Sequence, residues 1–148
     1  MADIFKIKWS SLDKEVRCKK IEHNQFIFDW FIKQLPIKSL QGHTMAAGEG
    51  LMLVSVPLKE ALNWKPRSEV MEEIRAQREG RITMFMGIGT STGIVIKYGK
   101  ITEDMSYPTF AEVIEEDLPI LKKVGEQQWN AMLFTKEIII AEFCKVED

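Results

Sequence analysis

A chain of 148 residues with 45% hydrophobic and 28% charged residues has the size and composition of one folded globular domain, which excludes an intrinsically disordered chain. Its net charge of -2 and its isoelectric point near 5.8 provide no long-range positive field for phosphate groups, so we expect no nucleic-acid partner. The apolar runs are far shorter than the roughly 20 residues that span a bilayer, so we expect a cytoplasmic protein with no membrane partner.

Cysteine and histidine usage argues against a metal site. Cys18 and Cys144 lie near opposite ends of the chain, and neither belongs to a CxxC pair. This favours a reducing compartment in which each thiol behaves as a small buried hydrophobe. Two histidines, His23 and His43, are too few for a metal triad, so we expect neither a metal nor a cofactor.

The first twenty residues predict a β-hairpin. Residues 4–9 alternate apolar side chains with lysines, which is the two-residue period of a half-buried strand. Residues 10–13 then turn the chain, and residues 16–19 continue the same alternation. We therefore expect two antiparallel strands that share one buried face.

A helix and two extended segments are expected next. Apolar residues at helical spacing after Asn24 predict a helix that ends near Leu35, with Asn24 as its N-cap and Pro36 as its stop. Residues 37–40 are expected to be extended. Residues 51–56 are apolar on nearly both faces, which is typical of a central strand.

The middle of the chain predicts a helix and a second hairpin. Ser68 precedes a segment with one apolar side and one charged side, the pattern of an amphipathic helix, and Gly80 ends it. Residues 82–86 and 94–98 are rich in strand-forming residues and predict two paired strands. The glycine-rich segment 87–93 is expected to form the tip of this hairpin.

Two helical segments and a closing strand are expected near the C-terminus. Thr109 and the glutamate three residues later match a capping box, which predicts a helix start. Pro119 is tolerated at the beginning of a further helical segment that continues to about Leu133 and buries Trp129. The β-branched residues within 136–143 favour a strand.

The order of these elements predicts the fold class. No repeat, low-complexity tract or linker divides the chain, so we expect a single domain over residues 1–148. Strands in neighbouring hairpins with interspersed helices, without a regular βαβ alternation, predict an α+β domain with an antiparallel sheet. A partly closed barrel with helices at its ends is an alternative form of the same class.

Several short segments resemble the cyclophilin-like fold of small bacterial proteins. They are the helix after Asn24 up to Leu35-Pro36-Ile37, the Gly48-Glu49 turn before the strand that ends at Pro57, Gly80-Arg81-Ile82, and the strand that ends in Tyr98-Gly99. The resemblance covers roughly residues 1–105. Within this group the chain is most similar to bacterial proteins related to cucumopine synthase.

This resemblance implies a cyclophilin-like antiparallel β-barrel with one to two end helices and a helical C-terminal extension at about residues 109–133. It also implies a closed small-molecule pocket and, for the opine synthases, a condensation of histidine with a 2-oxo acid that forms a new ring. Prolyl isomerases of this fold use an arginine and a glutamine spaced along one strand, and Arg17, Arg67 and Arg81 all lack that spacing. Peptidyl-prolyl isomerase activity is therefore a less favoured alternative, since fold alone does not carry function.

A histidine, a glutamate and a tyrosine are the candidate catalytic residues. His43 and Glu49 bracket a loop that enters the central strand, so a base and a carboxylate are expected to reach the same space. Tyr98 ends a strand near the expected barrel mouth, where a phenol can orient an amino acid. The alternative interpretation is structural, with His43 in a surface loop, Glu49 capping a turn and Tyr98 in the core.

Six further residues are candidates for substrate binding. Trp64 and Arg67 share a loop, which suits a pocket wall or a subunit contact and leaves a homo-oligomer open. Thr90 and Ser91 lie in the glycine-rich tip, whose backbone N–H groups suit a carboxylate or phosphate. That tip matches neither a P-loop nor a dinucleotide fingerprint. The last two follow the second hairpin. The six are Trp64, Arg67, Thr90, Ser91, Glu103 and Tyr107.

Together these residues favour a protein that binds a small polar metabolite, an amino acid or a 2-oxo acid. If it is an enzyme, we expect cofactor-free acid–base chemistry of the opine-synthase type, with His43 or Glu49 moving protons and Tyr98 assisting. A ligand-binding or assembly module without turnover is the main alternative.

Overall fold

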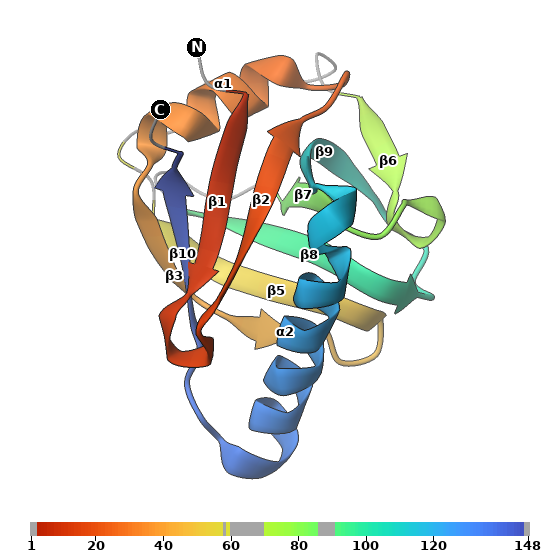
Figure 1. The fold of residues 1–148 in the computed structure, drawn as a ribbon. Helices are drawn as coiled ribbons and strands as arrows, with labels where there is room; N and C mark the ends of the chain where they lie inside the picture. Colours follow the sequence, from red (N-terminus) through yellow and green to blue (C-terminus); the bar gives the residue numbers. More distant parts are fainter. Residues whose placement is uncertain (1–2, 58, 60–69, 86–90, 147–148) are drawn as a thin grey trace.

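Strand pairing sets the architecture of the chain. The computed structural model describes residues 3–57, 59, 70–85 and 91–146, and ten strands and two α-helices lie within these ranges (Figure 1). The strands are β1 (Ile4–Trp9), β2 (Lys14–Lys20), β3 (Ile37–Leu40), β4 (Gly42–His43), β5 (Gly48–Pro57), β6 (Met71–Glu73), β7 (Arg81–Phe85), β8 (Ser91–Ile101), β9 (Ser106–Val113) and β10 (Ile140–Lys145). The helices are α1 (Gln25–Gln34) and α2 (Leu118–Asn130).

The sheet is antiparallel and strongly curled. Its strand order in the described residues is β3-β10-β1-β2-β9-β7-β8-β5-β4, and β6 pairs with β9 beside this path. The first and last strands of the order, β3 and β4, are separated in sequence by Gln41 alone, so the two ends of the sheet approach each other. The pairings nevertheless leave the sheet open. The predicted α+β class is confirmed, and the closed cyclophilin-like barrel is not.

The expected strands form because their alternation buries one face. Phe5, Ile7 and Trp9 are fully buried, and β1 pairs with β2 as the hairpin prediction requires. The strands predicted around residues 37–40, 51–56, 82–86 and 94–98 are confirmed as β3, β5, β7 and β8, and the closing strand begins at Ile140 rather than at residue 136. The tip of the second hairpin, residues 86–90, lies outside the described residues.

A cluster of aromatic rings fills the core beneath α1. Helix α1 supplies Phe28 and Phe31, whose rings meet those of Phe5, Phe110 and Phe143 from three strands at centroid distances of 5.2 to 5.7 Å. Such edge-on aromatic contacts add stabilisation beyond the buried apolar area. The cluster therefore joins β1, β9, β10 and α1 into one core.

Asn24 occupies the predicted N-cap position of α1, and its carbonyl accepts the first helical bonds, but its side chain does not cap the helix. It has a left-handed φ of 54° and makes no side-chain bond to the helix. Its amide nitrogen instead donates to the carbonyls of Val70 at 2.8 Å and Thr109 at 2.7 Å, and its oxygen accepts from the Val70 N–H. The predicted cap is therefore a bridge between distant segments, because two backbone partners compete for the side chain.

Two of the predicted helices are wrong. In place of the helix expected after Ser68, which is itself outside the described residues, β6 pairs with β9 and is followed by a short 3-10 turn at Ile74–Ala76. The capping box at Thr109 lies within β9, where the threonine hydroxyl accepts a bond from Gln77 Nε2 at 2.6 Å. Strand pairing thus overrides the local helix preference of both segments.

Helix α2 lies across β8, β5 and β4 on one face of the sheet (Figure 1). It begins at Leu118 with Pro119 in its first turn, so the expected C-terminal extension is helical only from there. The side chains on its buried face include Leu121, Val124 and Gln128. A π-helical turn at Ala131–Thr135 then leads the chain toward β10.

Two polar contacts hold α2 in place. Asp117, directly before the helix, accepts bonds from the backbone N–H, Nε and Nη2 of Arg17 at 2.7, 3.0 and 3.0 Å. Hydrogen bonding to the Arg17 guanidinium lowers the pKa of the Asp117 carboxyl. Further along, Gln128 accepts a buried bond from Gln41, which in turn accepts one from the Trp9 indole. The sheet ends and the helix are therefore joined at Gln41.

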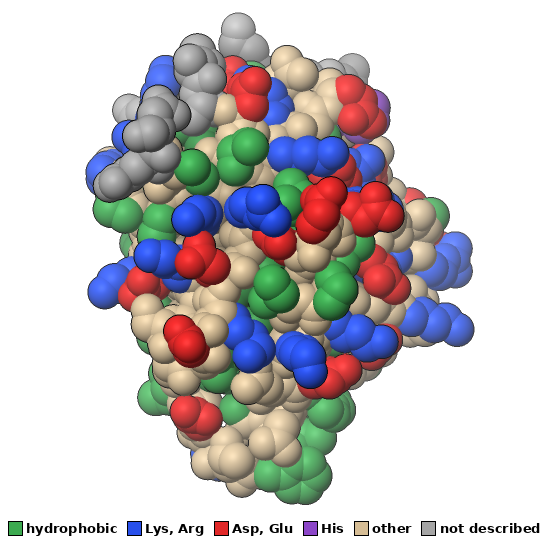
Figure 2. Space-filling model, in the orientation of Figure 1, with side chains coloured by type: hydrophobic (Ala, Val, Ile, Leu, Met, Phe, Trp, Pro, Cys, Tyr) green, Lys and Arg blue, Asp and Glu red, His purple; other side chains and the backbone are tan. Residues whose placement is uncertain are grey.

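The face of the molecule in Figure 2 carries lysine and arginine side chains interspersed with aspartate and glutamate. A mixed surface of this kind produces no extended field of one sign. Within the described ranges, neither helix combines the length and the apolar character needed to cross a membrane.

Asp117→Asn is expected to lower the free energy of unfolding by about 1–2 kcal/mol at pH 7, because it weakens bonds to a charged partner that is itself half exposed. As the pH falls, the Asp117 carboxyl takes up its proton in the unfolded chain before it does so in the folded chain, because its pKa is lowered in the folded chain. The contribution of Asp117 to stability is thus present above about pH 4 and lost as the pH falls further. Urea unfolding at pH 7 and pH 3 measures both effects, with the exposed neighbour Glu116→Gln as control. Equal destabilisation at both pH values would contradict the assignment.

Candidate functional site

The structure brings His43 and Tyr98 into direct contact. Leu51 of β5 pairs with His43 of β4 on one side and with Ile96 of β8 on the other. Tyr98 lies two residues beyond Ile96 and points to the same face, since side chains alternate along a strand. The two polar side chains meet there, with His43 Nε2 2.6 Å from the Tyr98 hydroxyl.

The hydrogen-bond partners determine where the protons lie. His43 Nδ1 is 2.6 Å from the carbonyl oxygen of Thr44, which can only accept, so Nδ1 carries the ring hydrogen. Nε2 is then unprotonated and accepts from the Tyr98 hydroxyl. The two side chains form a neutral donor–acceptor pair with a defined direction.

Burial keeps this pair neutral. Only 7% of His43 and 5% of Tyr98 is exposed. Desolvation lowers the pKa of His43, although its bond to Thr44 and the negative charge of Glu49 oppose that shift. Desolvation also raises the pKa of Tyr98 to about 12, and the charges of Glu49 and Glu126 add to the effect. The shared proton therefore resides on the phenol at neutral pH.

Helix α2 covers the pair with two residues on one helix face. A Cβ atom at Gly125 would overlap three carbon atoms of the Tyr98 ring, so only glycine permits this approach. Four residues later, the Trp129 ring lies over His43 at a centroid distance of 4.7 Å. Trp129 is 36% exposed, which corrects the expectation that it belongs to the core. The four-residue spacing from Gly125 to Trp129 puts both residues on one side of a helix, and this was the signal in the sequence that could have linked them to one site.

Glu49 lies near the pair but does not touch it. It is exposed, and its Oε1 accepts from the Lys100 N–H at 3.0 Å. Its carboxylate occupies the space that a side chain at Gly99 would need. Because Gly99 and Tyr98 face opposite sides of β8, Glu49 influences the pair through its charge rather than through contact.

The other expected binding residues are not gathered at this pair. Trp64, Arg67 and Thr90 lie outside the described residues, as does the side chain of Ser91 at the start of β8. Glu103 lies between β8 and β9 and lines a small apolar pocket of about 20 Å³ together with Thr44 and Ile101. Tyr107 lies on β9 opposite Glu72, with its hydroxyl 3.8 Å from Met105 Sδ.

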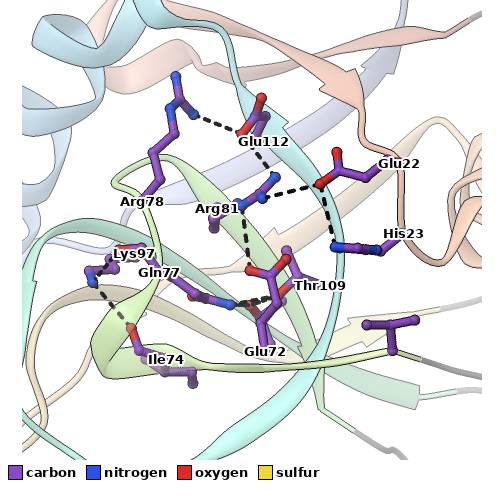
Figure 3. A network of polar contacts seen from close by, with 12 residues as sticks. Glu22, His23, Glu72, Ile74, Gln77, Arg78, Arg81, Lys97, Thr109 and Glu112 are labelled. Carbon is purple, nitrogen blue, oxygen red and sulfur yellow. Dashed lines mark hydrogen bonds and ion pairs between the residues drawn. The ribbon is translucent and has the colours of Figure 1, made fainter.

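A second polar network surrounds Arg81 on β7 (Figure 3). Its guanidinium lies 3.0 Å from a carboxylate oxygen of Glu112, 3.4 Å from Glu72 and 3.9 Å from Glu22. Arg78 binds the same Glu112 oxygen at 2.9 Å. Both arginines of this network have glutamate partners within the chain, so we interpret it as structural.

Lys97 also has a structural role. Its buried Nζ donates to the carbonyls of Ile74, Arg75 and Gln77 at 3.1, 3.1 and 2.6 Å (Figure 3). Desolvation lowers the pKa of this lysine. Its three donors are taken up by the backbone and fasten the 3-10 turn to β8. Among the described residues, no group of three histidine, cysteine or acidic side chains is placed to hold a metal ion.

Comparison with known proteins supports the fold. Neither a protein-family model nor a curated protein matches the chain. A solved structure, that of McbB in complex with tryptophan, is similar with a TM-score of 0.79 at 22% sequence identity. The match covers 97% of this chain and 46% of that one, so the chain spans about half the length of McbB. A structural likeness at this identity shows a related fold.

His43 is expected to titrate below the ordinary value of about 6.5, with its hydrogen on Nδ1 at pH 7. Its contribution to stability is thus present above about pH 6.5 and lost on acidification, because the unfolded chain takes up the proton first. Long-range ¹H–¹⁵N spectra measure the pKa and the tautomer, and His23→Gln assigns the signals. A hydrogen on Nε2 at pH 7 would refute the proposed direction of the bond.

Gly125→Ala is expected to lower the free energy of unfolding by about 1–2 kcal/mol. Alanine favours a helix over glycine by about 1 kcal/mol, but the clash of its methyl group with the Tyr98 ring outweighs this gain. Urea unfolding measures the difference, and Lys122→Ala on the exposed side of α2 is the control. A variant as stable as the wild type would show that α2 approaches β8 less closely.

Proposed function

We propose that the chain binds an amino acid and that the His43–Tyr98 pair moves a proton during the condensation of that amino acid with a 2-oxo acid. The observation that carries this proposal is the 2.6 Å bond between His43 Nε2 and the Tyr98 hydroxyl in a buried, neutral pair. Oriented imidazole and phenol groups are recurrent general acids and bases. Two further lines support the proposal.

The first line is the similarity to a protein that binds an amino acid. McbB has a related fold and was solved in complex with tryptophan. The second line is the sequence resemblance to proteins related to cucumopine synthase, which implies a ring-forming condensation. Both point to the same class of ligand, so an amino acid is a stronger candidate than a peptide or a nucleotide.

The chemistry suits a weak base. Condensation of an amine with the carbonyl of a 2-oxo acid forms an imine and releases water. When a ring carbon of the amino acid then attacks the imine carbon, the imine nitrogen takes up a proton and the attacking ring, now cationic, must lose one. Such a cation is strongly acidic, so a histidine of low pKa, reached directly or through the Tyr98 hydroxyl, is sufficient to accept that proton.

Ligand binding without turnover is a second candidate function, favoured by the burial of the pair. With exposures of 7% and 5%, both side chains are covered by α2, with Trp129 against His43 and Gly125 against Tyr98. Trp129 is itself 36% exposed, so a substrate that reaches the pair must pass or displace part of this cover. In the non-catalytic alternative, the pair fixes β4 against β8 and the ligand lies elsewhere.

One reaction distinguishes the two functions. The protein is incubated with proteinogenic amino acids and pyruvate or 2-oxoglutarate, and mass spectrometry seeks products whose mass is the sum of both reactants minus water. We expect such a product, formed about 100-fold more slowly by Tyr98→Phe and His43→Gln. His23→Gln, at a half-buried histidine outside the pair, is the matched control. Equal rates in all variants would refute a role for the pair, and retention of an amino acid without product would favour the binding function.

A further inference from the structure

A cleft on the other side of α2 has the features of a separate binding site. It has a volume of about 420 Å³, within the range of small-molecule sites. Three segments form its walls: the turn of the β1–β2 hairpin, one side of α2, and the chain that leads into β10. Figure 1 shows the hairpin turn and the C-terminal half of α2 near the same end of the molecule. The lining residues are Leu12, Lys14, Lys123, Glu126, Gln127, Asn130, Glu137 and Ile139.

The four charged side chains of this cleft have no ion-pair or hydrogen-bond partner among the residues that the structure describes. Lys14 and Lys123 supply two ammonium groups, and Glu126 and Glu137 supply two carboxylates. Within the described part of the chain, none of these four side chains forms an ion pair or a hydrogen bond. This contrasts with Arg81, whose charge is balanced by three glutamates. The opposite charges in the cleft are therefore not paired with one another, although Lys123 and Glu126 line it from the same side of α2.

Unpaired charges of both signs favour a ligand that also carries both signs. A ligand with only a carboxylate would be attracted by the lysines and repelled by the glutamates. A ligand with only an ammonium group would be attracted by the glutamates and repelled by the lysines. A zwitterion can place each of its ends near an opposite charge. The amides of Gln127 and Asn130 add donors and acceptors, while Leu12 and the buried Ile139 provide apolar surface for a side chain.

We propose that this cleft binds an amino-acid zwitterion with an apolar side chain. Its carboxylate lies toward Lys14 and Lys123, and its ammonium group lies toward Glu126 and Glu137. The site is distinct from the His43–Tyr98 pair, because none of its lining residues belongs to that pair. Binding here does not depend on the function proposed above.

The experiment is a ¹H–¹⁵N chemical-shift titration of the full chain with three probes of similar shape. L-leucine carries both charges, 3-methylbutylamine lacks the carboxylate, and 4-methylpentanoate lacks the ammonium group. We expect L-leucine to shift the amides of cleft residues and to bind roughly three- to tenfold more tightly than either single-charge probe, because partly exposed charge contacts are individually weak. Absence of cleft shifts with L-leucine would overturn the proposal.

Paired variants test each half of the site. Lys14→Gln with Lys123→Gln should weaken L-leucine and 4-methylpentanoate but leave 3-methylbutylamine unaffected or slightly tighter. Glu126→Gln with Glu137→Gln should weaken L-leucine and 3-methylbutylamine. Lys122→Gln, adjacent to the cleft lysine in sequence but absent from the lining, is the matched control and should change nothing.

A last variant separates this site from the pair. Tyr98→Phe should leave L-leucine binding unchanged if the cleft is the site. If Tyr98→Phe abolished binding while the four cleft substitutions did not, the cleft proposal would be overturned and an amino-acid site at the pair would be supported. If Tyr98→Phe lost the product of the condensation reaction but still bound L-leucine, the cleft and the pair would be two separate sites.

Discussion

The close approach of α2 to β8 is the constraint on which the candidate site depends. Residue 125 has no side chain, and the Tyr98 ring occupies the space that one would fill. This contact places Trp129 over His43 and removes both members of the pair from water. The Asp117–Arg17 bonds fix the start of the same helix, and Gln128 ties it to the link between the two ends of the sheet. One helix thus covers the candidate site with its buried face and forms a wall of the cleft with its other side.

The chemistry of the pair follows from this burial. Desolvation disfavours the charged form of any group, so it lowers the pKa of the histidine and raises that of the tyrosine. The two shifts favour the same neutral state, in which the phenol donates to the imidazole. The charge of Glu49 raises both pKa values, so it opposes the shift of one group and reinforces the shift of the other. The result is a weak base with a defined tautomer.

The polar groups of this protein fall into two kinds. The groups around Arg81 and Lys97 have their partners within the chain. They connect strands β7, β8 and β9 with one another and with the 3-10 turn at Ile74–Ala76 (Figure 3). Those of the cleft beside α2 face a hollow and have no such partners within the described ranges. Since a charged group gains most from a ligand when it has no competing partner, the second kind is the better candidate for recognition. Glu126 belongs to the cleft and also acts on Tyr98 through its charge, so the two regions are electrostatically linked.

The sequence by itself determined the strands whose alternation buries one face, the helix before Pro36 and the α+β class, because these depend on the period of apolar residues along the chain. It also indicated His43 and Tyr98 as candidates. Tertiary structure alone decided that Thr109 lies in a strand, that Asn24 bridges two distant segments, and that Glu49 lies apart from the pair. In each case the partner is far away in sequence: Thr109 pairs with Thr83 in the sheet, Asn24 donates to the carbonyl of Thr109, and Glu49 accepts from the Lys100 N–H. Such long-range contacts override local preference. The contact between His43 and Tyr98 itself needs β5 between them, and no pattern within either segment contains that information.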